Sequence, residues 1–386
     1  MKFSKRIQAI RPSMTLAVDA KAKELQANGI NVISFGAGEP DFNTPDKIKQ
    51  AGISAIEQNA THYTPVGGIE KLKQAIVNKL ERDNNLVYEK NQVLVSCGAK
   101  HSFFNLAQVL WEEGDEIIIP APYWVSYPDI IQYAGAKPII IDTLDENQFK
   151  VTPDQINEVI TPSSRAIIIN SPSNPTGSAY TKKELEAIAE CALRNKLLII
   201  SDEIYEKIVF DGFDQHSIGA IGKEVQKNSI IINGVSKSYA MTGWRIGYLA
   251  GNEEIIKQAT KLQGQSTSNP TSISQIASIT ALKDTDSDVK LMVDEFQERR
   301  DALLKGLLNI PSIKCYKPVG SFYAFPDFSA FYGKSFKDQR VSGSIQMANF
   351  LLENGNVALV PGIAFGADKN LRMAFASSMD KIEEGV

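Results

Sequence analysis

The chain has 386 residues, a formal net charge of −4, 43% hydrophobic residues and 22% charged residues. This length suits one large domain and a smaller one. The charge leaves no basic excess to neutralise the phosphates of a nucleic acid. No apolar stretch approaches the roughly 18–20 residues that span a bilayer. The three cysteines are far apart and the three histidines are scattered, so we expect a cytoplasmic protein without disulfides or a metal site.

Short apolar runs in the middle of the chain predict the strands of one sheet. Most of them lack the alternation of a half-exposed strand, which is typical of strands with helices on both faces. The runs lie at 93–96, 116–119, 138–141, 166–170, 197–201, 230–233 and 246–250. Between them, Thr181 with Glu184 forms a capping-box pattern that opens a helix to about residue 195. Thr152 followed by Pro153 predicts a second helix start.

Alternating strands and helices predict an α/β domain with a mostly parallel sheet over residues 45–285. The pattern changes near residue 286. A long charged helix is expected at 289–308, and short strands are expected within 317–323 and 357–361. We therefore predict a smaller α+β domain made of residues 1–44 and 286–386.

Unusual polar residues follow several of the predicted strands. Because open α/β sheets bind ligands at the carboxyl ends of their strands, we expect these residues to meet at one site. In chain order they are Gly98-Ala99-Lys100, Tyr123-Trp124, Asn174, Asp202 with Tyr205, and Ser236-Lys237 with Arg245.

This set of side chains suits an aromatic, phosphorylated aldehyde cofactor. A lysine can form a Schiff base with the aldehyde, and a helix N-terminus with an arginine can bind the phosphate. A carboxylate can keep a pyridine nitrogen protonated, while Asn and Tyr can bind a phenolic oxygen and Trp can stack on the ring. Each residue also has an ordinary alternative: Lys237 as a solvated lysine, Asp202 as a helix cap, Asn174 as a turn residue and Trp124 as core. Only their joint placement favours the cofactor.

The sequence resembles the class I aminotransferases, which are fold type I pyridoxal-phosphate enzymes, and is most similar to the bacterial aspartate aminotransferase subgroup. Three segments carry this resemblance, and it extends from about residue 13 to about residue 378. They are Ser236-Lys237-Ser-Tyr-Ala-Met-Thr-Gly-Trp-Arg245-Ile-Gly, Asn174-Pro-Thr-Gly and Asp202-Glu-Ile-Tyr205. The resemblance implies a seven-stranded, mostly parallel sheet and pyridoxal 5′-phosphate as the cofactor.

The resemblance also implies a role for each matching residue. Lys237 would hold the cofactor and later move the proton between the substrate and the cofactor. Asp202 would pair with the pyridine nitrogen, Asn174 and Tyr205 would contact the phenolic oxygen, and Trp124 would stack on the ring. The implied phosphate contacts are Gly98, Ala99, Lys100, Ser236, Arg245 and, from the partner subunit of a homodimer with shared active sites, the residue equivalent to Tyr63.

For the substrate, the resemblance implies that Arg372 and the backbone of Gly38 bind the α-carboxylate, with Trp124 and Asn174 nearby. A surface position for Arg372 is disfavoured, because it lies inside an apolar strand where an unpaired charge is costly. Lys100, Ser13 and Thr15 match the residues that bind the distal carboxylate of an acidic substrate. Lys100 could otherwise be a solvated residue at the start of a helix.

These inferences predict an aspartate aminotransferase that converts L-aspartate and 2-oxoglutarate to oxaloacetate and L-glutamate by a ping-pong mechanism. Two alternatives use the same cofactor residues: an aminotransferase that accepts aromatic amino acids or prephenate, and a carbon–sulfur β-lyase. A non-catalytic binding protein on this scaffold would need to have lost the lysine or gained a DNA-binding module. The chain keeps Lys237, and we recognise no DNA-binding module in it.

Overall fold

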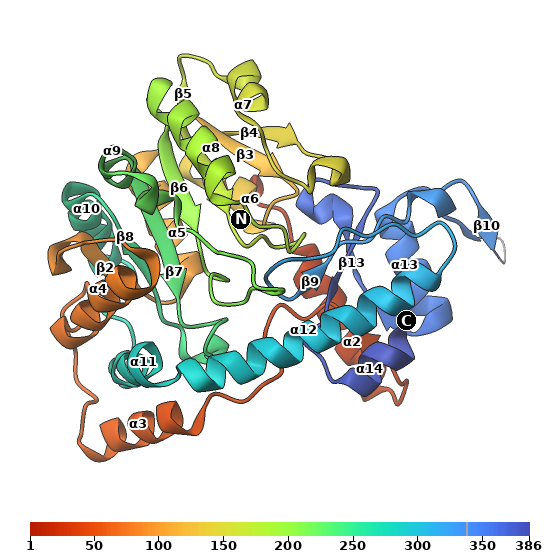
Figure 1. The fold of residues 1–386 in the computed structure, drawn as a ribbon, viewed down its shortest axis with the longest axis horizontal. Helices are drawn as coiled ribbons and strands as arrows, with labels where there is room; N and C mark the ends of the chain where they lie inside the picture. Colours follow the sequence, from red (N-terminus) through yellow and green to blue (C-terminus); the bar gives the residue numbers. More distant parts are fainter. Residues whose placement is uncertain (337–338) are drawn as a thin grey trace.

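The computed structural model describes residues 1–336 and 339–386. Within these residues the main sheet has seven strands in the order β2-β8-β7-β6-β5-β3-β4 (Figure 1). Each predicted apolar run forms one of them, so the seven-strand prediction is confirmed. The strands are β2 (Val93–Ser96), β3 (Glu116–Ala121), β4 (Lys137–Asp142), β5 (Ser164–Asn170), β6 (Leu198–Asp202), β7 (Ser229–Gly234) and β8 (Gly247–Ala250).

Most of the main sheet is parallel, as the sequence predicts. The neighbouring pairs among β4, β3, β5, β6 and β7 are parallel, whereas β8 is antiparallel to both β7 and β2. Because β8 alone is reversed, β2 runs in the same direction as β7. The first residue of β8 therefore lies at the edge where the other six strands end.

Helices cover both faces of this sheet, which explains why its strands are continuously apolar. Ile117 and Ile119 pack in one core cluster with α5, α6 and α10, whereas Ile118, between them, packs in another cluster with α8. Successive side chains of a strand point to opposite faces, so every position needs an apolar residue. The α-helices of this part are α3 (Asp46–Glu57), α4 (Glu70–Asn84), α5 (Ala99–Leu110), α6 (Ser126–Ala134), α7 (Pro153–Val159), α8 (Lys182–Arg194), α9 (Lys223–Lys227), α10 (Glu253–Gly264) and α11 (Ser272–Asp284).

Both predicted helix starts are confirmed. The Thr181 hydroxyl accepts a hydrogen bond from the Glu184 backbone N–H, and Glu184 accepts one in return from the Thr181 N–H. Thr152 and Gln155 make the same reciprocal pair at the start of α7. Each box satisfies two N–H groups that the first helical turn leaves without partners.

The rest of the chain packs beside the end of the main sheet. Its helices are α1 (Lys5–Gln8), α2 (Met14–Ala27), α12 (Asp286–Asn309), α13 (Ser344–Gly355) and α14 (Met379–Gly385). Its strands are β1 (Ile33–Ser34), β9 (Tyr323–Ala324), β10 (Ser335–Phe336), β11 (Gln339–Arg340), β12 (Val357–Ala358), β13 (Val360–Pro361) and β14 (Leu371–Ala374). The order β13-β14-β9 forms an antiparallel sheet, and β1 pairs with β12 in parallel.

The long helix α12 joins the two parts, running from beside α11 to α13 and α14 in Figure 1. It confirms the helix predicted at 289–308. The strand predicted within 317–323 was mostly wrong: only Tyr323 lies in a strand, since Gly320 makes an isolated bridge to Val209, and Ser321 and Phe322 form a turn. The domain limits of 45–285, and of 1–44 with 286–386, stay a prediction.

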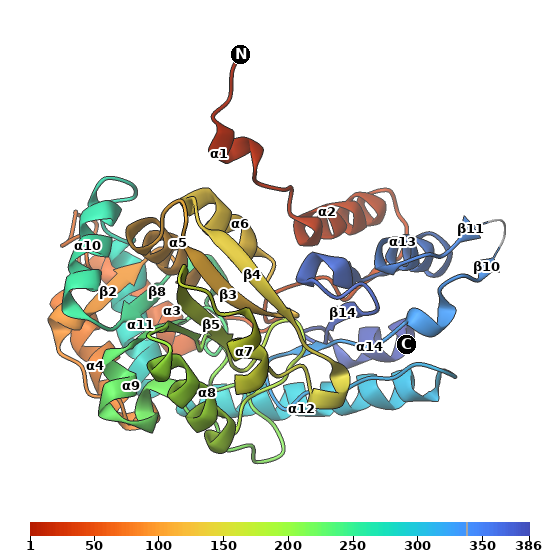
Figure 2. The same ribbon diagram turned by 90° about the horizontal axis from the view of Figure 1, so that it is seen from above.

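The N-terminal segment extends away from the body of the molecule, with α1 apart from the other helices in Figure 2. Its contacts include an ion pair between Arg11 Nε and Asp129 Oδ1 in α6, at 3.2 Å. No helix in residues 1–336 or 339–386 has the length and apolar character that crossing a membrane requires.

Candidate active site

The direction of the strands brings the predicted site residues together. β2, β6 and β7 end at one edge of the sheet, where Gly98, Asp202 and Lys237 lie at or just after their ends. The reversed strand β8 begins at that same edge, so Arg245 enters the site just before it. Asn174 follows β5 at this edge. The polar residues that follow the strands therefore lie at one edge of the sheet, as predicted. Arg245 is among them because β8 is antiparallel to its neighbours.

Gly98 and Arg245 form a tight cradle at the N-terminus of α5. Gly98 has a φ of +91°, which L side chains rarely adopt, and a Cβ there would lie 2.3 Å from Arg245 Nη2. The guanidinium donates to the carbonyls of Thr242 at 2.9 Å and Cys97 at 3.3 Å. The backbone N–H groups of the first turn of α5 lie beside this cation, which suits a phosphate. Ser236 is buried next to Lys237 in the chain.

The Asp202 carboxylate is buried at the end of β6 and is held from two sides. Its Oδ2 accepts a hydrogen bond from the Tyr127 hydroxyl at 2.6 Å, and its Oδ1 accepts one from the Ile204 N–H at 3.2 Å. Burial raises the pKa of Asp202, while the Tyr127 hydroxyl, the Ile204 N–H and nearby Lys237 oppose that rise. A turn follows Asp202, so the alternative role as a helix cap is wrong.

Trp124 lies between β3 and α6, and Tyr127 lies in the first turn of α6, where it contacts Asp202. Their rings meet edge to face with centroids 5.1 Å apart. Trp124 is half-buried, so part of its ring is accessible to a ligand. Tyr127 is a residue of this site that our sequence reasoning missed. Its phenol sits in the segment Tyr-Trp-Val-Ser-Tyr, but nothing local to that segment indicates a contact with Asp202, 75 residues further along the chain.

Asn174 and Tyr205 lie close to a second residue that sequence reasoning missed, Tyr323 in β9. The Tyr205 and Tyr323 hydroxyl oxygens are 3.0 Å apart. Asn174 Oδ1 accepts a hydrogen bond from Arg372 Nη1 at 3.1 Å, which orients the amide so that its NH₂ group remains to donate elsewhere. Tyr205 is buried, and burial is the main reason why its pKa lies well above its usual value.

Arg372 is a buried cation whose contacts are to neutral groups. It is 3% exposed, and its Nη2 donates to the Gly36 carbonyl at 2.8 Å in addition to the bond with Asn174. Within the part of the chain that the structure describes, its Nε has no hydrogen-bond partner. A buried charge with a free donor is costly unless an anion reaches it. The geometry therefore suits a ligand carboxylate.

The Lys237 ammonium is held at the centre of this group by the Gly38 carbonyl, to which Nζ donates a hydrogen bond. Burial is the main reason why the pKa of Lys237 is lowered to about 8; Glu39 opposes this shift, and the charges of Arg372, Arg245 and Lys100 add to it. A lysine with this pKa is partly deprotonated near neutral pH, so a fraction of it is the neutral amine that can act as a nucleophile or base.

Two of the three residues predicted to bind a distal carboxylate, Lys100 and Ser13, border a cavity of about 610 Å³ between the N-terminal segment, α5 and α6. Lys100 and Ser13 line it, together with Arg245, and the Ser13 and Thr15 hydroxyls lie 2.8 Å apart. Lys100 Nζ stands 5.0 Å from the centroid of the Trp124 ring. Lys100 thus contacts both this cavity and Trp124, and Thr15 is joined to the cavity through Ser13. The apolar part of the lining comes from Ile7, Ile10, Phe104, Ile130 and Tyr133.

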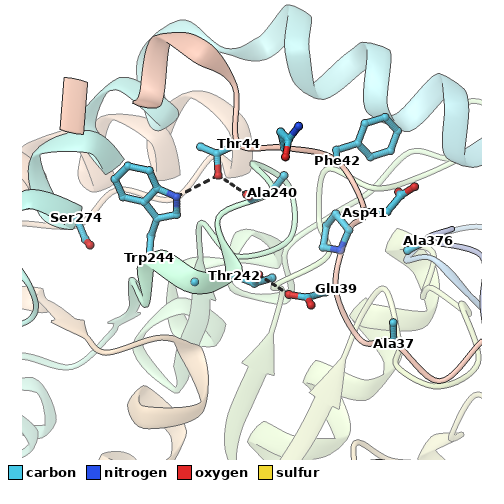
Figure 3. A pocket seen from close by; sticks show the side chains of 13 residues that line it. Ala37, Glu39, Asp41, Phe42, Thr44, Ala240, Thr242, Trp244, Ser274 and Ala376 are labelled. Atoms are coloured by element: carbon cyan, nitrogen blue, oxygen red, sulfur yellow. Dashed lines mark hydrogen bonds between the residues drawn. The ribbon is translucent and has the colours of Figure 1, made fainter. Parts of the chain in front are cut away.

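A second cavity, of about 670 Å³, opens between the loop of residues 37–44 and the loop of residues 240–244 (Figure 3). Hydrogen bonds fix the first loop to the second: Thr242 Oγ1 donates to Glu39 at 2.7 Å, and Trp244 Nε1 donates to Thr44 at 3.0 Å (Figure 3). Asp41 in the same loop pairs with Arg299 of α12 at 2.7 Å. The loop that carries Gly38 is therefore attached both to the loop of residues 240–244 and to α12.

Tyr63 is the one predicted site residue that the structure leaves apart from the others. Its side chain is 92% exposed, and no hydrogen bond found in residues 1–336 and 339–386 joins it to the group around Lys237. In those same residues no cluster of His, Cys, Asp and Glu side chains is arranged to hold a metal ion.

The sequence profile described as "Aminotransferase class I and II" matches residues 30–386. The chain belongs to this family. It is 48% identical to the aspartate aminotransferase of Bacillus sp. (strain YM-2), over 100% of this chain and 97% of that relative. It is 47% identical to the aspartate/prephenate aminotransferase of Nitrosomonas europaea, over 100% and 98%. The solved aspartate aminotransferase of Rhizobium meliloti superposes with a TM-score of 0.96 at 39% identity, covering 100% and 97%.

These findings confirm the predicted fold type I architecture and pyridoxal phosphate as the cofactor of the family. The residues fit that group on independent grounds. The Gly98 cradle would be filled by any Cβ, the buried Asp202 carboxylate is held by a hydroxyl and an N–H, and Lys237 carries an amine of lowered pKa. The cofactor would be held by these residues together with Arg245, Asn174, Tyr205 and Trp124.

Proposed function

We propose that this aminotransferase takes the amino group of L-aspartate and passes it to 2-oxoglutarate, forming oxaloacetate and L-glutamate in two alternating half-reactions. The proposed substrate rests on one observation: the site has two cationic groups, one for each carboxylate of a dicarboxylate. Arg372 offers a free Nε from a buried guanidinium, and Lys100 stands by Ser13 over Trp124. Both cations act on Lys237, so both lie near the reacting centre.

The bound cofactor supplies an aldehyde that takes up the amino group and a protonated ring that accepts the electrons left at the substrate Cα. The protein binds and orients the substrate and the cofactor. Arg372 fixes the α-carboxylate, which orients the Cα–H bond toward Lys237. Lys237 Nζ would accept the proton from the substrate Cα and return it to the cofactor. Its pKa of about 8 suits this exchange at neutral pH.

Asp202 would keep the ring nitrogen protonated, and Tyr127 favours the ionised form of Asp202 by donating to its buried carboxylate. Asn174 and Tyr205 would donate to the phenolic oxygen. The half-buried Trp124 covers one face of the site and limits the access of water. Arg245 and the first turn of α5 would anchor the phosphate.

The direct test is to add L-aspartate to the cofactor-loaded protein without an acceptor and to record the visible spectrum. We expect the absorbance of the aldehyde-bearing cofactor to fall and that of its amino form to rise, followed by reversal with 2-oxoglutarate. The Lys237→Ala variant should bind cofactor but give no turnover, because it lacks the proton carrier. Normal turnover in that variant, or a spectrum that aspartate does not change, would contradict the proposal.

Substrate choice is tested separately with Lys100→Ser. Loss of the ammonium should raise the KM for aspartate by at least about tenfold, the equivalent of one moderate charged contact. The KM for an aromatic donor should change much less, because that donor has no distal carboxylate. An equal effect on both donors would remove Lys100 from the specificity role.

A second candidate activity, transfer to prephenate or from an aromatic amino acid, is favoured by the apolar side of the cavity at Lys100. Phe104, Tyr133 and Ile130 offer a surface on which a ring can pack. The Nitrosomonas europaea relative is named for aspartate and prephenate together. Half-reaction spectra with prephenate's amino product and with phenylalanine distinguish the two activities.

We further propose that the protein works as a homodimer with shared active sites, in the cytoplasm. The exposed Tyr63 supports the first point, because its phenol is free to reach the phosphate site of a partner subunit. Two hydrogen bonds anchor its loop: the buried Gln275 side chain donates to Thr64 at 3.0 Å and accepts from the Ile69 N–H at 2.8 Å. The three free cysteines support a reducing compartment.

A further inference from the structure

Tyr323 lies between the groups that would bind the cofactor and the group that would bind the substrate. It is 1% exposed and comes from β9, whose partner strand β14 carries Arg372. Its ring stacks against Arg372, with the guanidinium carbon 4.5 Å from the ring centroid. The same side chain therefore contacts both the small antiparallel sheet and the edge of the main sheet.

The Tyr323 hydroxyl has one hydrogen-bond partner among the described residues, the hydroxyl of Tyr205 at 3.0 Å. It also faces the substrate loop, because a Cβ on Gly38 would lie 3.5 Å from this oxygen. Burial raises the pKa of Tyr323, so the phenol keeps its proton at any working pH. The Tyr323 hydroxyl is thus neutral, and in its bond with Tyr205 either hydroxyl can be the donor.

We propose that Tyr323 is a positioning residue that donates a hydrogen bond to Tyr205 and so strengthens the bond Tyr205 makes to the phenolic oxygen of the cofactor. This inference rests on the proposed function, which places that oxygen beside Tyr205. An ionised phenolic oxygen can only accept, so Tyr205 must donate to it. The Tyr205 oxygen then accepts from Tyr323, which fixes the direction of the relay. Chains of hydrogen bonds in a buried site strengthen one another.

The relay has a measurable consequence for the proton that the Lys237 nitrogen shares with the neighbouring phenolic oxygen. A strong donor on that oxygen withdraws electron density from it, so the oxygen holds the proton of the lysine nitrogen less well. Removing the relay makes the oxygen more basic and raises the pKa of the pair. One hydrogen bond between neutral groups corresponds to a shift of about half a unit to one unit.

The test is a pH titration of the visible absorbance of the cofactor-loaded protein, without substrate, for wild type and Tyr323→Phe. Phenylalanine keeps the ring that packs on Arg372 and removes only the hydroxyl. We expect the spectroscopic pKa to rise by about half a unit to one unit while the KM for aspartate stays within about twofold. Tyr323→Leu, which also removes the ring contact with Arg372, should in addition raise that KM.

Two comparisons separate a relay from a packing effect. In a Tyr205→Phe background, Tyr323→Phe should cause no further shift, because the hydroxyl then has no partner through which to act. The control Tyr332→Phe removes a tyrosine hydrogen bond of 2.6 Å, to the Asp368 carbonyl, in the same part of the chain and should leave the pKa unchanged.

An unchanged spectroscopic pKa in Tyr323→Phe, or an equal shift in the Tyr205→Phe background, overturns the relay and leaves the aminotransferase assignment intact. If the wild-type protein gives no visible absorbance with added pyridoxal phosphate, the proposed function itself fails, and this inference fails with it.

Discussion

The hydrogen bond from Tyr127 to Asp202 offers the sharpest test of the electrostatics of the site. Both groups are buried, and the two oxygens are 2.6 Å apart. A hydrogen bond to a charged group contributes about 1.5–3 kcal/mol. In Tyr127→Phe, Asp202 keeps the Ile204 N–H and the charge of Lys237 but loses the phenol, so burial raises its pKa with less opposition. A carboxylate that protonates more easily is less able to keep the ring nitrogen of the cofactor protonated.

If the whole contribution of this bond is felt in the transition state, kcat falls by roughly ten- to a hundredfold, since each 1.4 kcal/mol is tenfold in rate. The assay is steady-state kinetics with aspartate and 2-oxoglutarate at saturating cofactor. The matched control is Tyr180→Phe, which removes another buried tyrosine hydroxyl, one that accepts from the Val151 N–H at 3.0 Å. A kcat for Tyr127→Phe within about twofold of wild type, with the cofactor fully bound, would refute the reasoning.

Three further predictions concern the phosphate cradle, Lys237 and the joint at α12. Gly98→Ala places a Cβ 2.3 Å from Arg245 Nη2 at a φ of +91°, so the Kd for pyridoxal phosphate in equilibrium dialysis should rise at least about tenfold; an unchanged Kd would contradict the cradle. Because the pKa of Lys237 is about 8 and only the neutral amine attacks an aldehyde, cofactor uptake by the cofactor-free protein should accelerate as pH rises through that value and then level off. A rate independent of pH would count against this pKa. Hydrogen bonds from Arg300 and Lys317 lower the pKa of Asp211, so its stabilisation is present above its unfolded value and is lost as pH falls. Urea unfolding should therefore show that Asp211→Asn loses more stability at neutral pH than below about pH 4, and equal losses would contradict the pairing.

The sequence alone determined the elements of the main sheet and most of the site. Each of the seven apolar runs carries its own burial signal, since side chains on both faces must be apolar. The Thr152 and Thr181 capping boxes are equally local, because a helix start is decided by residues three positions apart. Gly98, Asp202 and Lys237 could be found because they follow those runs. The resemblance to the aminotransferases then supplied their roles.

Only the tertiary structure decided how the site is completed. The reversal of β8, which brings Arg245 to the edge where the other strands end, depends on pairing with β7 and β2 and leaves no mark in its own four residues. Tyr127 and Tyr323 escaped sequence reasoning because their hydroxyls meet Asp202 and Tyr205 across 75 and 118 residues of chain. A local pattern reports whether a side chain is buried. The identity of its hydrogen-bond partner is fixed only when distant segments pack, because a buried polar group takes whichever partner the fold brings to it.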